Sequence, residues 1–233
     1  MAIYKGNKKV VAVYKGSTPI NKIYKGSTLV FQKSGGGGST HSIEGTATGN
    51  FNLKINGNQI IPITPDADGK WFYDTDEKIT SLSEFLYGQL KVTSVDLSNF
   101  DLTDIPTNSM FEESTYITSI KFNNTKSIKL VEAARMFYDC WSLVSLDLSN
   151  FDTSSLTDVS YMFYACSKLV SLDLSNFDMS KATYYNNMFD GCNKLTHIKC
   201  KQAFKDWCIT HQDNISLPDT MREGGSGTWE IVG

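Results

Sequence analysis

Histidine is scarce in this chain, with three residues among 233, and none stands in an HExxH or HxH arrangement. The five cysteines include no CxxC pair, so the spacing usual for a zinc site is missing. No GxSxG turn occurs, and the "GGGG" run at 35–38 lacks the Lys-Ser/Thr ending of a phosphate-binding loop. These absences argue against common hydrolase, metalloenzyme and nucleotide-binding classes, and we expect neither catalysis nor a cofactor.

Long apolar runs are also missing: nowhere do 18 apolar residues stand together, so we expect no membrane insertion. Residues 1–33 lack the apolar core and cleavage site of a secretory signal. They contain seven Lys and no Asp or Glu, and because the chain has a net charge of −3, the other 200 residues carry −10. These lysines fall mainly at turns, without a recognition helix or RNA-binding signature, so we expect no nucleic-acid partner.

A repeat of 26 residues dominates the chain. "LVSLDLSNFDTSSLTDVSYMFYACSK" at 143–168 is followed by "LVSLDLSNFDMSKATYYNNMFDGCNK" at 169–194. Met-Phe pairs recur at this step, and Glu84-Phe85 continues the register as a degenerate first copy. The pairs begin at Met110, Met136, Met162 and Met188. The apolar triplet of the earliest copy, "VTSVDL" at 92–97, sits one residue late, which indicates a small insertion.

The repeat predicts a coil made of a strand and a return leg. In "SLDLS", alternate side chains of a strand put Leu146 and Leu148 inside and Ser145 and Asp147 in solvent. The return leg "TDVSYMFYACSKL" has apolar residues at helical spacing. One coil cannot bury its own apolar face, so neighbours must stack into a parallel sheet. We therefore expect an α/β repeat protein, a leucine-rich solenoid.

The cysteines that recur in the repeat, three residues after each phenylalanine, are expected to be small buried apolar residues. These are Cys140, Cys166 and Cys192. A disulfide between Cys200 and Cys208 is the alternative for the other two, although the odd count favours a reduced chain.

Five segments follow from these patterns. Residues 80–200 are the repeats; short strands and turn signals predict a β-rich N-terminal cap at 41–79, and a helix and closing strand predict a C-terminal cap at 201–233. Residues 34–40, "SGGGGST", read as a flexible linker. Residues 1–33 carry "IYKG", "VYKG" and "IYKG" every ten residues, which predicts three short strands.

A β-segment of 33 residues has too little core to be stable alone. Self-association would solve this, a trimer being one arrangement open to it, as would docking on an acidic particle surface. We expect residues 1–33 to be such an anchor. Its candidate contact residues are Tyr4, Lys5, Tyr14, Lys15, Tyr24 and Lys25.

The outward columns of the predicted sheet are short and polar, which suits hydrogen bonding to glycans or to a polar protein surface. The alternative is a plain solvated face. The candidate ligand-binding residues are Lys121, Ser145, Asp147, Ser171, Asp173, His197 and Lys199.

The wording "LDLSNFDTS" together with "MFYAC" resembles the BspA-like leucine-rich repeat proteins, bacterial surface proteins often linked to adhesion. This resemblance covers roughly residues 80–200 and implies a solenoid used for binding.

The "IYKGST" repeats are similar to N-terminal segments of structural proteins in phages and prophages of gut bacteria. This second resemblance implies a virion component, made in the host cytoplasm: a head fibre, decoration protein or tail-associated adhesin. Residues 1–33 would bind a capsid or tail protein, and the solenoid would bind a host-surface glycan or protein. The alternative is a cellular adhesin on the bacterial surface.

Overall fold

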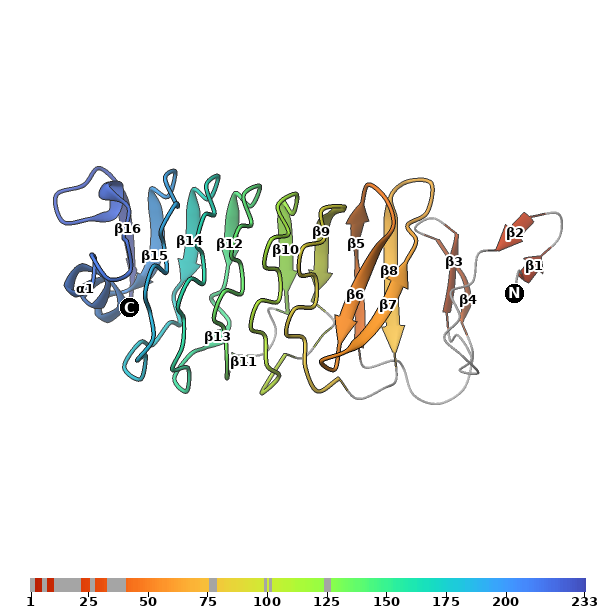
Figure 1. Ribbon diagram of the computed structural model, residues 1–233, viewed down its shortest axis with the longest axis horizontal. Helices are drawn as coiled ribbons and strands as arrows, with labels where there is room; N and C mark the ends of the chain where they lie inside the picture. The colour runs from red at the N-terminus through yellow and green to blue at the C-terminus, as the bar shows by residue number, and fades with distance from the viewer. Residues whose placement is uncertain are drawn as a thin grey trace.

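The computed structural model describes residues 3–5, 8–10, 22–25, 28–32, 41–75, 79–98, 100, 102–123 and 127–233. Its main body is a β-solenoid of about four turns, in which short strands follow one another along one axis (Figure 1). The strands of this row are β9 (Val92–Leu97), β10 (Ser119–Phe122), β12 (Ser145–Asp147), β14 (Ser171–Leu174), β15 (His197–Lys201) and β16 (Thr228–Val232). β10 pairs with β9, and β12, β14, β15 and β16 pair in that order, all in parallel.

The strands expected at "LDL" pair in the register that the repeat requires. Leu146 lies opposite Leu172 and Asp147 lies opposite Asp173, each pair 26 residues apart. Both leucines are buried, whereas Asp147 is exposed. The predicted parallel pairing, with leucine inward and aspartate outward, is therefore confirmed.

The first coil is one residue shorter than the repeat predicts. Ser94 pairs with Ser119, 25 residues further on. In the return legs, Glu84 and Ser109 make equivalent amide hydrogen bonds to the following coil, and both have a positive φ. The alignment of Glu84-Phe85 with the Met-Phe pairs is therefore wrong by one residue. Because the whole coil is shorter, no insertion ahead of β9 is needed.

The return leg consists of successive turns where the sequence predicted a helix. Within residues 157–169, Tyr161 and Ala165 have φ angles of 58° and 54°, in the left-handed region that an α-helix excludes. Alternate amides donate to the next coil, as that of Phe163 does to the carbonyl of Met188 at 2.9 Å. The Met, Phe and Cys spacing thus marks the inward positions of turns. The class is a β-solenoid with little helix, in place of the predicted α/β class.

Phenylalanine rings form the centre of the core, because each coil places its ring directly over that of the preceding coil. Neighbouring rings have centroids 5.6–5.7 Å apart and planes within 8° of parallel. The stacked residues are Phe111, Phe137, Phe163 and Phe189, all fully buried.

The repeated cysteines are buried and free, in agreement with the expected apolar role. Each thiol donates to the carbonyl of a phenylalanine in the preceding coil, as Cys166 does to Phe137 at 3.1 Å. Ser114 takes this position one coil earlier, where its hydroxyl donates to the carbonyl of Leu86 at 2.5 Å. Cys200 and Cys208 are also free and buried, so the alternative disulfide is absent from this structure.

Antiparallel strands close the solenoid at its N-terminal end. They are β5 (His41–Ala47), β6 (Phe51–Ile55), β7 (Gln59–Ile63) and β8 (Lys70–Thr75). β5 lies between β8 and β9, and β6 forms a hairpin with β7. A Cβ on Gly45 of β5 would lie 2.0 Å from the carbonyl oxygen of Ser94, so glycine is required where β5 meets β9. The strands expected in residues 41–79 are therefore present.

The C-terminal end carries the helix and the closing strand that the sequence predicts. Helix α1 (Gln202–Thr210) buries Phe204 and Cys208, and the 3-10 turn η1 (Asp219–Met221) precedes β16. β16 pairs with β15 in parallel and continues the sheet (Figure 1). A further short parallel pair joins β11 (Ile128–Lys129) to β13 (Phe151–Asp152).

Among its described residues, the N-terminal segment has strands at the first and third of the three predicted places, each paired with a further antiparallel strand. β1 (Ile3–Lys5) pairs with β2 (Lys8–Val10), and β3 (Lys22–Lys25) pairs with β4 (Thr28–Gln32). The first and third "YKG" copies therefore each contribute the first strand of a hairpin. The middle copy lies outside the described residues.

Candidate binding surface on the parallel sheet

The parallel register turns the repeated polar residues of the sheet into columns on its outer face. One column holds Ser145, Ser171 and His197, and its neighbour holds Asp147, Asp173 and Lys199. Six of the seven predicted ligand-face residues are thus brought together. Lys121, the seventh, lies in β10 and pairs in register with Asp96 of β9, in a separate ladder.

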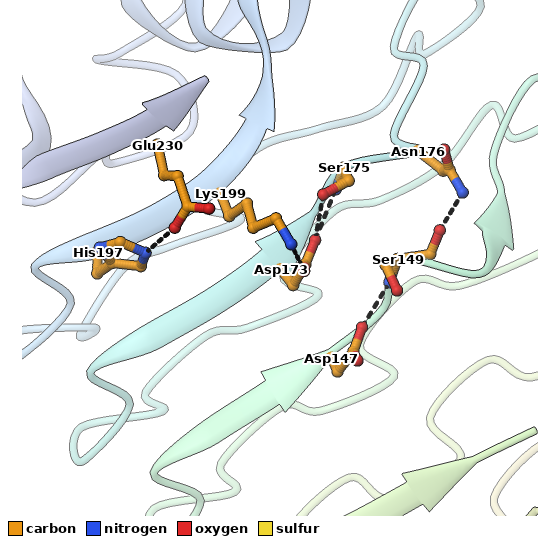
Figure 2. A network of polar contacts seen from close by, with 8 residues as sticks. All are labelled: Asp147, Ser149, Asp173, Ser175, Asn176, His197, Lys199 and Glu230. Atoms are coloured by element: carbon orange, nitrogen blue, oxygen red, sulfur yellow. Dashed lines mark hydrogen bonds and ion pairs between the residues drawn. The ribbon is translucent and has the colours of Figure 1, made fainter. Parts of the chain in front are cut away.

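The aspartates of this face close the turns that follow their strands. The Oδ1 atom of Asp147 accepts a hydrogen bond from the amide of Ser149 at 2.9 Å, and that of Asp173 accepts one from the amide of Ser175 at 3.1 Å (Figure 2). The Ser175 hydroxyl also donates to Asp173. This is the geometry of an Asx turn, in which a carboxylate holds the backbone two residues further on.

In each of the two ladders, a lysine from a neighbouring coil pairs with one outward aspartate. Lys199 Nζ lies 2.9 Å from Asp173 Oδ2, and Lys121 Nζ lies 3.0 Å from Asp96 Oδ2. Figure 2 shows Lys199 reaching along the sheet toward Asp173. Partial burial opposes the ionisation of Asp173, but hydrogen bonds from Ser175 and Lys199 outweigh it, so the pKa of Asp173 lies below its usual value.

His197 pairs with a residue that the sequence did not bring to this face. Its Nε2 atom lies 3.1 Å from Oε2 of Glu230, which belongs to the closing strand β16 (Figure 2). The register places Thr228 beside His197 and Glu230 beside Lys199. Only the pairing of β16 with β15 reveals this contact, because "GTWEIV" does not match the repeat pattern.

Asp147 differs from Asp173, the other aspartate of these columns. Among the described residues, no cation forms an ion pair with it, and Ser149 is the donor to its Oδ1 atom. The side-chain amide Nδ2 of Asn176 donates in turn to the carbonyl of Ser149 and ties the two turns together (Figure 2). The sheet face therefore offers an exposed carboxylate whose in-register neighbour is Asp173, beside the paired serines Ser145 and Ser171.

Sequence reasoning missed how general the Asp-x-Ser turn is. Six aspartates accept a hydrogen bond from the amide of the serine two residues later, at 2.8–3.1 Å. They are Asp96, Asp147, Asp152, Asp158, Asp173 and Asp178. The strings "DLS", "DTS", "DVS" and "DMS" are the signal that could have shown that these aspartates hold turns.

The structure places the backbone of most candidate anchor residues. Tyr4 and Lys5 lie in β1, and Tyr24 and Lys25 lie in β3. Tyr14 and Lys15 lie outside the described residues. Among the described strands, the two hairpins form separate two-stranded sheets, so the six candidates are not shown to share one surface.

A family model described as "Mycoplasma protein of unknown function, DUF285" matches residues 80–207, more than half of the chain. The match, together with the solenoid, is compatible with a BspA-like repeat protein. No curated protein and no solved structure matches the chain. In the part of the chain that the structure describes, no helix has the length and apolarity needed to cross a bilayer.

Proposed function

This chain belongs to the DUF285 family, and on that premise we propose that it is a non-catalytic display protein. Its solenoid would present a polar surface to a glycan or protein on a host cell, and residues 1–33 would attach it to a particle. The observation that carries the proposal is the sheet face itself, where equivalent polar side chains from successive coils form columns on a rigid core.

The chemistry of the repeated side chains supports recognition better than catalysis. The aspartates are engaged in turns and ion pairs, and the thiols are buried in hydrogen bonds to the backbone. Burial raises the pKa of Cys192 to about 12, so this thiol stays protonated near neutral pH and is a poor nucleophile.

The particle is the proposed location because of the N-terminal segment. Its "IYKG" repeats are similar to those of phage structural proteins, and its seven lysines contrast with the charge of −10 on the remaining residues. Its described strands pair in antiparallel fashion, β1 with β2 and β3 with β4. A basic segment would associate readily with an acidic capsid or tail surface, while the acidic solenoid would be repelled from it. Self-association through the same segment, a trimer included, is part of this proposal.

Deletion of residues 1–33 tests the attachment. We expect the truncated protein to keep the thermal unfolding of the solenoid and to lose association with purified particles, measured by co-sedimentation. As a matched control, substitution of Lys70, Lys91 and Lys194 by glutamine removes lysines from the rest of the chain and should leave association intact. Co-sedimentation of the truncated protein at the level of the full chain would show that attachment lies in the solenoid.

The second candidate is an adhesin on the surface of a bacterial cell, favoured by the family match and by the BspA-like wording of the repeats. The two candidates differ in where the native protein is found. Fractionation of the source culture would place a virion component with capsid protein after lysis and a cellular adhesin with the cell envelope before lysis.

A further inference from the structure

A cluster of aromatic residues lies on the return legs of two adjacent coils, away from the columns of the sheet face. The cluster consists of Arg135, Tyr138, Tyr161 and Tyr164. Tyr138 and Tyr164 stack with centroids 4.6 Å apart and planes 8° from parallel. The guanidinium of Arg135 lies over two rings, 5.2 Å from the centroid of Tyr138 and 5.3 Å from that of Tyr161.

The fold does not require this cluster, because the neighbouring coils fill the same positions with other residues. Hydrogen bonding shows that Arg135 and Tyr161 are equivalent to Ser109 and Asn187. By the same pattern, the positions of Tyr138 and Tyr164 are occupied by Glu112 in the preceding coil and Asp190 in the following one. Tyr87 occupies this position in the first coil as well, but Tyr138 and Tyr164 lie in adjacent coils, where their rings stack.

The left-handed backbone conformation at two of these residues lowers the stability of the fold. Arg135 and Tyr161 have φ angles of 57° and 58°, a region that Asn adopts more readily than a bulky residue does. The next coil has Asn187 there, with a φ of 54°. The other coils have Glu84, Ser109 and Asn187 at this left-handed position, so the repeat does not prescribe an arginine or a tyrosine there, and a role other than folding accounts for them.

The polar groups around the rings exclude charged ligands. Arg135 Nη1 lies 3.2 Å from Glu112 Oε1, so the guanidinium already has its counter-ion, and its side chain remains about half exposed for further hydrogen bonds. Glu113 accepts from the Tyr87 hydroxyl at 3.3 Å, and Asp139 accepts from the Trp141 indole at 3.0 Å. These carboxylates would repel an anion, and Arg135 occupies the place that a cation would take between the rings.

The size of the cluster argues against a protein partner. Its ring centroids lie within 6.4 Å of one another. The surface that the cluster covers is therefore much smaller than the area of about 800 Å² that each partner buries in a stable protein interface. Acidic residues flank the cluster in the adjacent coils, and such residues are depleted at the centres of protein interfaces. Rings with apolar faces, guanidinium donors and carboxylate acceptors together match a small neutral molecule that has an apolar face and hydroxyl groups at its edge.

We propose that Arg135, Tyr138, Tyr161 and Tyr164 form a binding site for a neutral oligosaccharide. The proposal rests on the display function given above and adds to the polar columns of the sheet a second surface, a glycan contact on the return legs. Tyrosine rings contact the C–H face of a pyranose, Arg135 donates to its hydroxyls, and nearby carboxylates accept from them. The Tyr138 hydroxyl is protonated near neutral pH, as any ordinary tyrosine is, and can donate as well; burial and the neighbouring Asp139 raise its pKa further.

Substitution by the residue of the neighbouring coil separates binding from folding. The full chain is titrated with trisaccharides of glucose, galactose, mannose and N-acetylglucosamine, with saturation-transfer NMR and calorimetry as readouts. We expect at least one to bind, and Tyr161→Asn to weaken it about tenfold, as for removal of an aromatic anchor, while the melting temperature stays the same or rises. Tyr184→Asn, which alters an exposed tyrosine outside the cluster, is the matched control and should change neither.

Three results would overturn the proposal. No binding of any of the four trisaccharides to the full chain removes the saccharide site. Equal binding by Tyr161→Asn, or loss of binding in Asp147→Asn instead, assigns the contact elsewhere. Capture of a deglycosylated host protein that depends on Tyr161 assigns the cluster to a protein partner. Each of these leaves particle attachment by residues 1–33 to be decided by the deletion experiment, so the two proposals fail separately.

Discussion

At the scale of single residues, the left-handed positions decide which side chains the return leg accepts. Each of the middle coils has two, four residues apart, as at Tyr161 and Ala165. A non-glycine residue there costs about 1–2 kcal/mol relative to the right-handed region. Hydrogen bonds to the next coil hold the backbone in place, so most coils tolerate a side chain at these positions.

Gly191 is the position where a side chain cannot be tolerated. Its φ is 77°, and a Cβ would lie 2.9 Å from the Cα atom of Ala165. We expect Gly191→Ala to lower the free energy of unfolding by about 2 kcal/mol or more, from the left-handed conformation and the clash together. Ala165→Gly, at the equivalent position of the preceding coil, is the control and should change it by less than about 0.5 kcal/mol, because relief of the conformation and loss of chain stiffness offset each other. Urea unfolding measures both, and equal stability of the two variants would contradict the argument.

At the scale of elements, the Asp-x-Ser turns that follow the strands make the stability of the fold depend on pH. Hydrogen bonds from Ser154 and Ser180 hold the pKa values of Asp152 and Asp178 below their usual range. For Asp96 and Asp173, hydrogen bonds outweigh the opposing effect of partial burial, with the same result. A depressed pKa in the folded state means that ionisation of the aspartate stabilises the fold.

The stabilisation from these aspartates is therefore complete above the unfolded pKa and is lost as the pH falls through the lower folded values. We expect the melting temperature to be steady down to about pH 5 and to fall below about pH 4. Asp152→Asn keeps an acceptor for the Ser154 amide but cannot titrate, so it should flatten this acid dependence. Thermal melts recorded by circular dichroism between pH 2 and pH 7 measure the effect. An acid slope that is unchanged in the variant would show that other groups cause it.

Also at this scale, strands were predictable from the sequence and the return legs were not. Strict alternation in "SLDLS" places Leu146 inward and Asp147 outward whatever surrounds the strand. In the return leg, the spacing from Met162 to Cys166 fits a helix equally well, because it reports only which residues face inward. The hydrogen bonds that go to the next coil, and the left-handed residues that they permit, cannot be read from one copy.

The part of the candidate site that lies on the strands was predictable from the sequence, and the rest was not. The columns follow from period and alternation, so Asp147, Asp173 and Lys199 were placed correctly on one face. The partner of His197 was not predictable, because Glu230 reaches it through a closing strand that breaks the repeat pattern. The tyrosine cluster was missed because its positions were assigned to a helix.

At the scale of the whole molecule, coils are interchangeable units. Leu143 and Leu169 occupy the same position, each donating its amide to the carbonyl of the cysteine three residues before it, at 3.1 and 3.0 Å. Removal of residues 143–168 should therefore join two compatible ends and give a shorter folded solenoid. Its melting temperature should be lower, since one coil interface is lost.

Removal of residues 156–168, about half a coil, is the matched deletion and should prevent folding, because it sets a strand where the next coil needs a return leg. Circular dichroism and analytical ultracentrifugation of both proteins measure the outcome. A collapsed protein from the whole-coil deletion, or a folded one from the half-coil deletion, would contradict the interchangeability of coils.

The 26-residue step also makes the reach of this protein adjustable in whole increments. Each coil adds one strand spacing, about 4.8 Å, to the distance between the two end structures of the solenoid. The two copies at 143–168 and 169–194 begin with the same ten residues, "LVSLDLSNFD", so recombination between them in the gene gains or loses one coil without disturbing the rest. A lineage that carries this gene can thus lengthen or shorten the molecule by a single genetic event, and each product keeps its two end structures unchanged.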